Sequence, residues 1–301
     1  MGAAVRRAVR DGAAGFRLPP HAGWGIAFVL PAFLLLLIFR VYPILSAVAV
    51  SFTDYDLFST PSFTGLSNYS QLATDPQFRQ SLLASITYVV GVSIPTWGIA
   101  LALALAFDER VPFRNLLRTG AFMPVVMTAV PVAVVWKFLF HPFGLVNVFL
   151  SRFGVDRINW LTDQSTAMPA LIIVGIWRAV PYFMVIFLAG LQAIPRDYYE
   201  AASLDGASAV SKFRHITLPL LRRTSVLVII MTVIVTMKAI MNPLIMTGGG
   251  PAGMTRVLPL LIYQTGFQYY RMGLASAMSV VMLLLVLLFT VWQLRLFREK
   301  T

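Results

Sequence analysis

The chain has 301 residues, of which 58% are hydrophobic and only 12% are charged, against about 25% charged in an ordinary soluble domain. A soluble fold of this length could not bury so much apolar surface, so the composition excludes a soluble enzyme, a disordered chain and a nucleic-acid module. The absence of cysteine excludes disulfides and thiol chemistry, and the net charge of +12 must be interpreted by position, because it can reflect polyanion binding or membrane topology.

Six apolar segments are long enough to cross a membrane. A helix needs about 20 apolar residues to span a hydrocarbon layer of about 30 Å. The apolar runs are continuous, whereas the strands of a membrane barrel alternate between apolar and polar residues. The segments are residues 24–50, 82–107, 119–140, 167–191, 224–246 and 274–296. We therefore predict an all-α integral membrane protein with six transmembrane helices.

The first segment also resembles a signal peptide. Four arginines precede it, and Ala47-Val48-Ala49 is similar to a small-residue cleavage site. Its apolar stretch is longer than the 7–15 residues of a signal-peptide core. We therefore favour a first segment that stays in the membrane as a span.

The distribution of lysine and arginine predicts the orientation of the six spans. The two tails and the second and fourth connections hold fifteen of these residues, and the first, third and fifth connections hold five. Positive charge accumulates on the cytoplasmic side, so both termini are expected in the cytoplasm. The predicted parts are a cytoplasmic tail at 1–23, a permease domain at 24–296 with a long cytoplasmic connection near 192–223, and a cytoplasmic tail at 297–301.

The spans contain no acidic residue. Ion-coupled carriers commonly place Asp, Glu or His at membrane depth, so built-in ion coupling is not expected here. A basic residue at the bilayer centre costs about 2.5–3.5 kcal/mol on insertion scales. We expect Arg40 and Lys137 to lie near the membrane surface. Arg178 and Lys238 lie deeper in their spans, and for them we leave open whether they face a cavity or have no role in the pathway.

No catalytic or metal-binding pattern is found in the sequence. Its three histidines are far apart, and no nucleophile turn is present. The glycine-rich stretch before Pro251 lacks the Gly-Lys-Ser/Thr ending of a phosphate loop and is expected to be a flexible external loop. We predict no catalytic residue, no metal and no cofactor in this chain.

The fourth connection, near 192–223, predicts a helix, a turn and a second helix. Pro195 suits a first helical turn, and Asp205-Gly206 is a turn signal in which glycine can be left-handed. Such a hairpin could simply lie on the membrane surface. Its small residues at the turn favour a knob that docks into a partner protein.

This connection resembles the Glu-Ala-Ala loop of permease subunits in binding-protein-dependent ABC importers, where the loop docks into the cytoplasmic ATPase. The residues that carry the resemblance, and to which it assigns ATPase coupling, are Glu200, Ala201, Ala202, Asp205 and Gly206. A second stretch, residues 244–251, is similar to the carbohydrate-type permeases. It is most similar to the first of the two paired permeases in maltose, glycerol-phosphate and trehalose-type systems.

The resemblance implies the type I importer permease fold in a prokaryotic cytoplasmic membrane. It also implies a second permease subunit, two copies of an ABC ATPase that carries ATP and Mg, and an extracytoplasmic solute-binding protein. The expected solute is a sugar or a sugar-like polyol or glycerol-phosphate ester. A secondary ion-coupled carrier is the alternative, followed by a receptor or assembly factor that transports nothing.

The sequence also offers candidates for contacts on the solute pathway, although residues of these types are more often structural. The candidates for the substrate pathway are Trp136, Trp177, Lys238 and Asn242. The candidates for contact with the binding protein are Gly248, Gly249, Gly250 and Pro251, because of their predicted external position.

Overall fold

A computed structural model describes residues 22–108 and 114–297, and the chain divides into two compact units, residues 1–49 and 50–301. In the first unit, α2 (Ala22–Leu36) continues through a π-helical turn, η1 (Leu37–Val41), into α3 (Tyr42–Val50). Residues 27–50 of this run are long and apolar enough to cross a membrane. The predicted first span is therefore helical over its described length.

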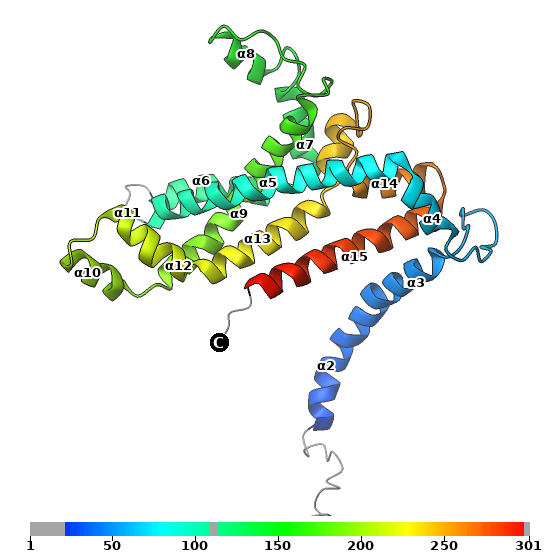
Figure 1. Ribbon diagram of the computed structural model, residues 1–301, viewed down its shortest axis with the longest axis horizontal. Helices are drawn as coiled ribbons and strands as arrows, with labels where there is room; N and C mark the ends of the chain where they lie inside the picture. The colour runs from blue at the N-terminus through cyan, green and yellow to red at the C-terminus, as the bar shows by residue number, and fades with distance from the viewer. Residues whose placement is uncertain (1–21, 109–113, 298–301) are drawn as a thin grey trace, which may run out of the picture. The chain divides into compact units, whose positions relative to one another are not determined.

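The second unit is built on four helices, of which three qualify individually as membrane spans. These three are α5 (Pro76–Asp108), α9 (Ala167–Gln192) and α15 (Met272–Phe297), and α13 (Arg222–Met237) packs against all of them. Figure 1 shows α5, α13 and α15 side by side. At 1.5 Å per residue α5 is about 50 Å long, so it extends beyond the hydrocarbon layer.

The most extensive helix contact joins α5 and α9, and glycines allow it. A methyl group at Gly175 of α9 would lie 2.7 Å from Val92 and 2.8 Å from the Tyr88 hydroxyl of α5. Small residues let helix backbones approach closely in membranes, where packing replaces the hydrophobic drive. The core of this contact is apolar, with Val92, Leu171 and Val174 fully buried.

The third and fifth predicted spans are not single straight helices. α6 (Arg114–Val126) and α7 (Ala129–Leu139) are bent by 107° at the break between them. α13 ends at Met237, and the chain resumes as a short helical turn that continues into η3 (Pro243–Thr247). Pro243 has no N–H to bond to the residue 239 carbonyl, so one hydrogen bond of a continuous helix is missing at this break.

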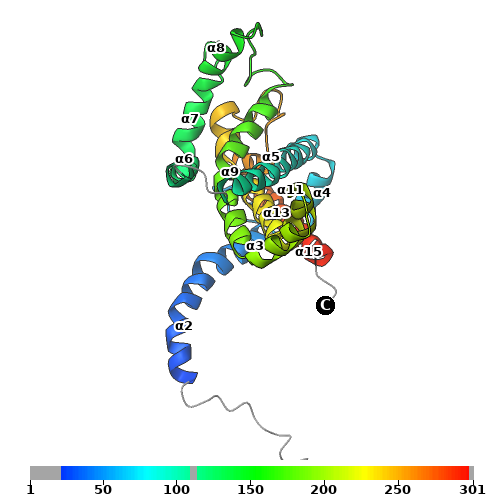
Figure 2. The ribbon, with the colours of Figure 1, turned by 90° about the vertical axis from the view of Figure 1, so that its left-hand side faces the viewer.

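The segments between the helices carry short elements of their own. α4 (Ser67–Thr74) precedes α5, and α8 (Leu145–Ser151) follows α7 in a lobe that projects from the bundle in both views (Figures 1 and 2). α14 (Leu258–Tyr263) and η4 (Gln264–Gln268) lead into α15. Within the described residues, four helices are long and apolar enough to cross a membrane. Two bent pairs raise this number to as many as six: α6 with α7, and residues 209–220 with α13, which are bent by 65°.

The first external connection is tied to the start of α15. Asn68 donates from its amide to the carbonyls of Ser51 (2.9 Å) and Thr53 (2.8 Å). The Gly273 amide donates to the Tyr55 carbonyl at 2.9 Å, and a side chain at Gly273 would clash with the Thr53 backbone. These bonds join α4 and the start of α15 to the same stretch, residues 51–55.

Candidate functional site

The fourth connection folds as the predicted hairpin. α10 (Arg196–Leu204) is followed by a turn, then by α11 (Ala209–Lys212), the π-helical turn η2 (Phe213–Thr217) and α12 (Leu218–Leu220). The hairpin lies at one end of the long helices, on the left in Figure 1, and α4 and α14 lie at the other end. By the orientation that the basic residues predict, the hairpin end is cytoplasmic.

Local hydrogen bonds define the tip of the hairpin. Gly206 is left-handed with φ of +74°, as the sequence predicts. Its amide donates to the Ser203 carbonyl at 3.1 Å, and the Ala207 amide donates to the Ala202 carbonyl at 2.8 Å. This pair of bonds is a Schellman motif, which closes the end of a helix. On the other side of the turn the Ser208 hydroxyl caps α11 by accepting from the Ser211 amide.

The stem of the hairpin is anchored in the bundle. Tyr199 and Phe213 pack on a buried apolar cluster that includes Leu191 at the end of α9 and Leu221 at the start of α13. The Tyr199 hydroxyl also bonds to Thr217 Oγ1 at 2.9 Å. The stem of the hairpin is therefore in direct contact with the ends of α9 and α13.

The tip, in contrast, is open to solvent. Leu204 is 89% exposed and Val210 is 74% exposed, and the side chain of Glu200 is also exposed. Solvent-exposed apolar groups of this kind mark an interaction surface when they gather on one feature. All five predicted coupling residues lie on α10 or in the turn after it.

A cavity of about 430 Å³ lies where the two interrupted spans meet α5 and α9. Val125 and Ala129 flank the break between α6 and α7, and they line it from one side. The end of α13 and the break after it contribute residues 235, 236 and 238–242. Discontinuous helices at mid-membrane are a recurrent way to build solute sites in transporters.

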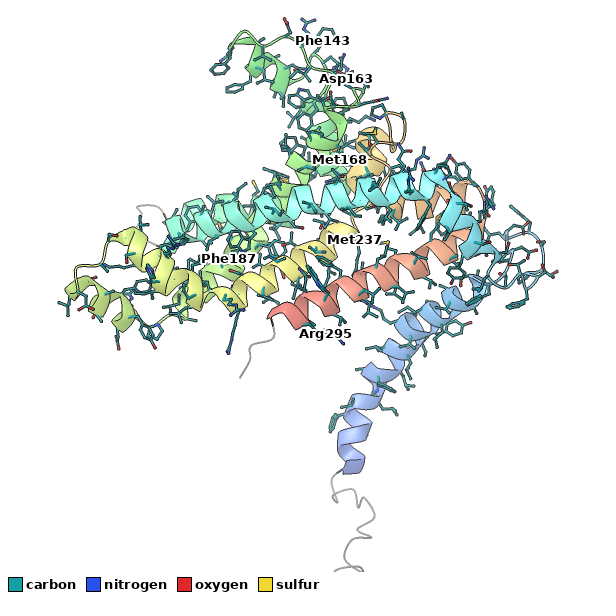
Figure 3. All side chains as sticks on the ribbon, in the orientation of Figure 1. Phe143, Asp163, Met168, Phe187, Met237 and Arg295 are labelled. Carbon is teal, nitrogen blue, oxygen red and sulfur yellow. The ribbon has the colours of Figure 1, made fainter. Side chains whose placement is uncertain are left out.

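One face of α9 forms the wall of this cavity. Gly175, Arg178, Ala179, Tyr182 and Phe183 all line it, at the spacing of residues that share one helical face. The bundle near this wall is tightly packed, with Phe187, labelled in Figure 3, fully buried one turn further along α9.

Polar groups from three helices converge on the cavity. Tyr88 of α5, Arg178 of α9, and Lys238 and Asn242 from the break after α13 are all among its lining residues. Arg178 is half-buried, Lys238 is exposed and Asn242 is buried, at 6% exposure. The Asn242 carbonyl oxygen has no hydrogen-bond partner within the described part of the chain.

The structure divides the predicted pathway residues between two places. Lys238 and Asn242 line the cavity. Trp136 and Trp177 do not; they contact each other edge to face at 5.5 Å between ring centroids, and Trp136 also packs on Phe140, which contacts Trp160. This aromatic cluster joins α7, α9 and the external lobe, and a role for either tryptophan in solute passage stays a prediction.

The glycine-rich stretch after η3 has a defined conformation rather than the loose one expected from its composition. Gly248 is exposed with φ of +61°, whereas Gly249 is buried. Thr255 closes the loop by bonding to Thr247 Oγ1 at 2.7 Å and to the Gly250 carbonyl at 2.5 Å. Gln80 of α5 donates to the Ala252 carbonyl next to Pro251 at 2.8 Å, so the loop is fastened to the bundle.

Sequence reasoning singled out Arg178 as a charged residue within a span but did not place it among the pathway candidates, and it missed Tyr88 and Tyr182. The spacing of Gly175, Arg178 and Tyr182 on one face of a predicted span was available as a signal. Tyr88 offers no such signal, because its place in the cavity depends on how α5 crosses α9.

Comparison with known proteins agrees with this architecture. Residues 96–300 match the family described as "Binding-protein-dependent transport system inner membrane component". The chain is 34% identical to the trehalose/maltose transport system permease protein MalF of Thermococcus litoralis over 93% of its own length and 95% of the relative's. It is 33% identical to the sn-glycerol-3-phosphate transport system permease protein UgpA of Agrobacterium fabrum, over 90% and 93%.

Among solved structures, the chain resembles a subunit of a bacterial alginate ABC transporter in complex with a periplasmic protein that binds an alginate pentasaccharide. The TM-score is 0.80 at 22% identity, and the match covers 90% of this chain and 93% of the other. The shared fold is that of an importer permease, and the family match covers more than half of the sequence. The chain therefore belongs to the family of binding-protein-dependent transport system inner membrane components, as a multi-pass permease subunit.

Proposed function

We propose that this permease forms part of the pathway of an ATP-driven carbohydrate importer and that its α10–η2 hairpin receives the force of a cytoplasmic ATPase. The observation that carries the proposal is the hairpin itself, whose stem is packed into the bundle and whose apolar tip is uncovered. A second permease subunit, two ATPase copies that bind ATP and Mg, and an external binding protein complete the assembly.

The hairpin connects mechanically to the cavity. Its stem packs on the inner ends of α9 and α13, and these two helices, together with the break after α13, supply most of the cavity wall. A displacement of the hairpin would therefore shift both walls. This arrangement supports a role in coupling ATPase closure to alternating access.

The carbohydrate class is supported by the relatives, whose names specify trehalose and maltose, glycerol 3-phosphate or alginate. The cavity volume of about 430 Å³ falls within the range of sites for small molecules. Nothing in the cavity favours the alternative of an ion-coupled carrier, because no carboxylate is found among its lining residues.

The test is recovery of the partners with the tagged chain, purified gently from its native membrane and analysed by mass spectrometry. We expect a second six-span permease and an ATPase with Walker motifs. Gly206→Asp should reduce ATPase recovery by at least about fivefold, the loss typical of an interface residue that matters, because it adds a charged side chain at the docking tip.

Gly154→Asp is the matched control. Gly154 is also left-handed, with φ of +75°, and a side chain has open space at both glycines. Gly154 lies in the lobe after α8, away from the hairpin, so this variant should recover the ATPase as the unaltered chain does. Equal losses in both variants, or undiminished recovery with Gly206→Asp, would remove the coupling role from the tip.

A further inference from the structure

The cavity brings two cationic side chains to mid-span without a carboxylate. Arg178 lies near the middle of α9, with more than about 15 Å of helix on either side, and Lys238 lies at the interrupted end of α13. Within residues 22–108 and 114–297 the acidic side chains all lie outside the cavity lining: Asp54, Asp56, Asp75, Asp108, Asp156, Asp163, Asp197, Glu200 and Asp205. The two positive charges therefore have no acidic counterpart at the site.

The protein itself compensates only one of the two charges. The last carbonyls of α13 face the Lys238 end of that helix, and a helix C-terminus favours a cation. Arg178 is in mid-helix and has no such compensation. Other membrane helices keep arginine in place by pairing it, by facing it to a water-filled cavity or by using it on a substrate path.

Most polar groups of the site can donate hydrogen bonds to an anion. Guanidinium and ammonium groups can only donate, and the hydroxyls of Tyr88 and Tyr182 can donate as well. Asn242 can donate from its amide nitrogen, whereas its unpartnered carbonyl oxygen is an acceptor. Beside the donors, the exposed ring of Tyr182 offers a flat apolar face on which a sugar ring can lie.

We infer that this cavity takes a carbohydrate that bears an anionic group, such as a carboxylate, sulfonate or phosphate, with Arg178 and Lys238 holding the anion. The inference rests on the proposed function, since it names the class of solute that passes this site. An arginine fork pairs with such oxyanions in a bidentate way, and these charge-assisted bonds are about twice as strong as neutral ones.

A carboxylate from the partner permease is the other source of negative charge. The cavity has room for a small ligand beside the two cations, with a volume of about 430 Å³. A bound anion and an ion pair between subunits differ in one measurable respect: only the first gives an acidic sugar tighter binding than its neutral counterpart.

The experiment uses the intact complex, purified with its co-isolated partners and placed in lipid nanodiscs. Two matched pairs of probes are added at millimolar concentration, and thermal unfolding is followed: a digalacturonic acid against the galactose disaccharide of the same linkage, and glucose 6-phosphate against glucose. Ligands that bind the native state raise its unfolding temperature with concentration, which gives an apparent Kd for each.

We expect the acidic member of at least one pair to bind about tenfold or more tightly than its neutral counterpart. Arg178→Gln and Lys238→Gln should abolish this preference, and Arg178→Lys should restore part of it. Lys137→Gln is the control, because Lys137 is an exposed cation at the end of α7 outside the cavity; it removes the same charge and should leave the preference intact.

The inference would be overturned by equal binding of both members of each pair, or by an acidic preference that survives in Arg178→Gln and Lys238→Gln. Loss of the second permease from the Arg178→Gln complex, without a preference in the unaltered one, would show an ion pair between subunits instead. In each of these outcomes the ATPase is still recovered with the chain. Failure of the proposed function would differ, because then no ATPase is recovered at all.

Discussion

Single residues with many hydrogen bonds hold the external lobe after α7 together. Asn147 is 4% exposed, and its amide nitrogen donates to the carbonyls of His141 (3.3 Å), Pro142 (3.1 Å) and Ile158 (2.9 Å). Its oxygen accepts from the Ile158 amide and from Trp160 Nε1, both at 3.2 Å. One side chain thus fastens both ends of the segment that contains α8.

Asn147→Leu should loosen this lobe without affecting the bundle. The change leaves buried backbone groups without partners, at about 1–3 kcal/mol for each group that stays dry. Limited trypsin digestion should cut faster at Arg152 and Arg157, which lie between the fastened ends. Ser151→Ala removes one bond from an exposed hydroxyl on α8 and should leave the digestion rate unchanged; faster cutting in both variants would contradict the role of Asn147.

At the scale of elements, the α5–α9 contact sets the shape of the cavity. Gly175 belongs to both the cavity wall and the helix contact. It lines the cavity, and it lets Val92 and Tyr88 approach the α9 backbone closely. Because Val92 is stiff and fully buried, it cannot turn aside for a larger residue. The position of Tyr88 at the site therefore depends on the absence of a side chain at residue 175.

Gly175→Ala should destabilise the protein by about 1–3 kcal/mol, the usual cost of overpacking. Gly98→Ala is the matched control, because Gly98 lies in the interior of α5 with no atom within 4 Å of an added methyl group. Alanine is the better helix former, so Gly98→Ala should be neutral or slightly stabilising. Thermal unfolding in detergent measures both, and an unfolding temperature for Gly175→Ala equal to or above that of Gly98→Ala would contradict the packing argument.

Much of this architecture could be predicted from the sequence, because helical spans and tight turns are specified locally. The six apolar segments correspond to helical segments, and the left-handed Gly206 lies at the turn where it was expected. The sequence could not predict the angle of 107° between α6 and α7. Nor could it predict that α13 ends at the cavity. Prolines such as Pro124 and Pro243 permit such breaks, but their direction depends on neighbouring helices.

The candidate site was predictable only where one segment carries it. All the coupling residues lie within one hairpin, so their spacing along the chain identified them together. The cavity draws Tyr88, Arg178 and Asn242 from three helices, and their convergence follows from packing at Gly175 rather than from any motif. Trp136 and Trp177 were chosen for their chemistry, and the structure places them in an aromatic cluster outside the cavity.

At the scale of the whole molecule, the helix bundle connects the external loop of residues 248–251 to the cytoplasmic hairpin. The loop of residues 248–251 is fastened to α5 through the bond from Gln80 to Ala252, and it follows the interrupted fifth span that borders the cavity. The hairpin is fastened to the inner ends of α9 and α13. We propose that an external binding protein contacts this loop at the exposed Gly248, as the sequence suggested, and so influences the same helices as the ATPase.

Gly248→Asp should weaken the stimulation of ATP hydrolysis by the binding protein, because it adds a charge at an exposed position where no atom lies within 4 Å of an added side chain. We expect a reduction of about fivefold or more in apparent affinity. Gly65→Asp is the comparison, since Gly65 has the same φ of +61° in the first external connection. Full stimulation with Gly248→Asp, or an equal loss with Gly65→Asp, would remove the specific role of this loop.

The Schellman closure of α10 has a consequence for biosynthesis. The bonds that shape the tip join only residues 199–212 to one another, so the tip has these partners as soon as this stretch has left the ribosome. At that moment α13 is still inside the ribosome and α15 has not yet been synthesised. A partner that recognises the tip is thus able to meet the nascent chain before its last two spans enter the membrane, and the order of assembly need not wait for the finished bundle.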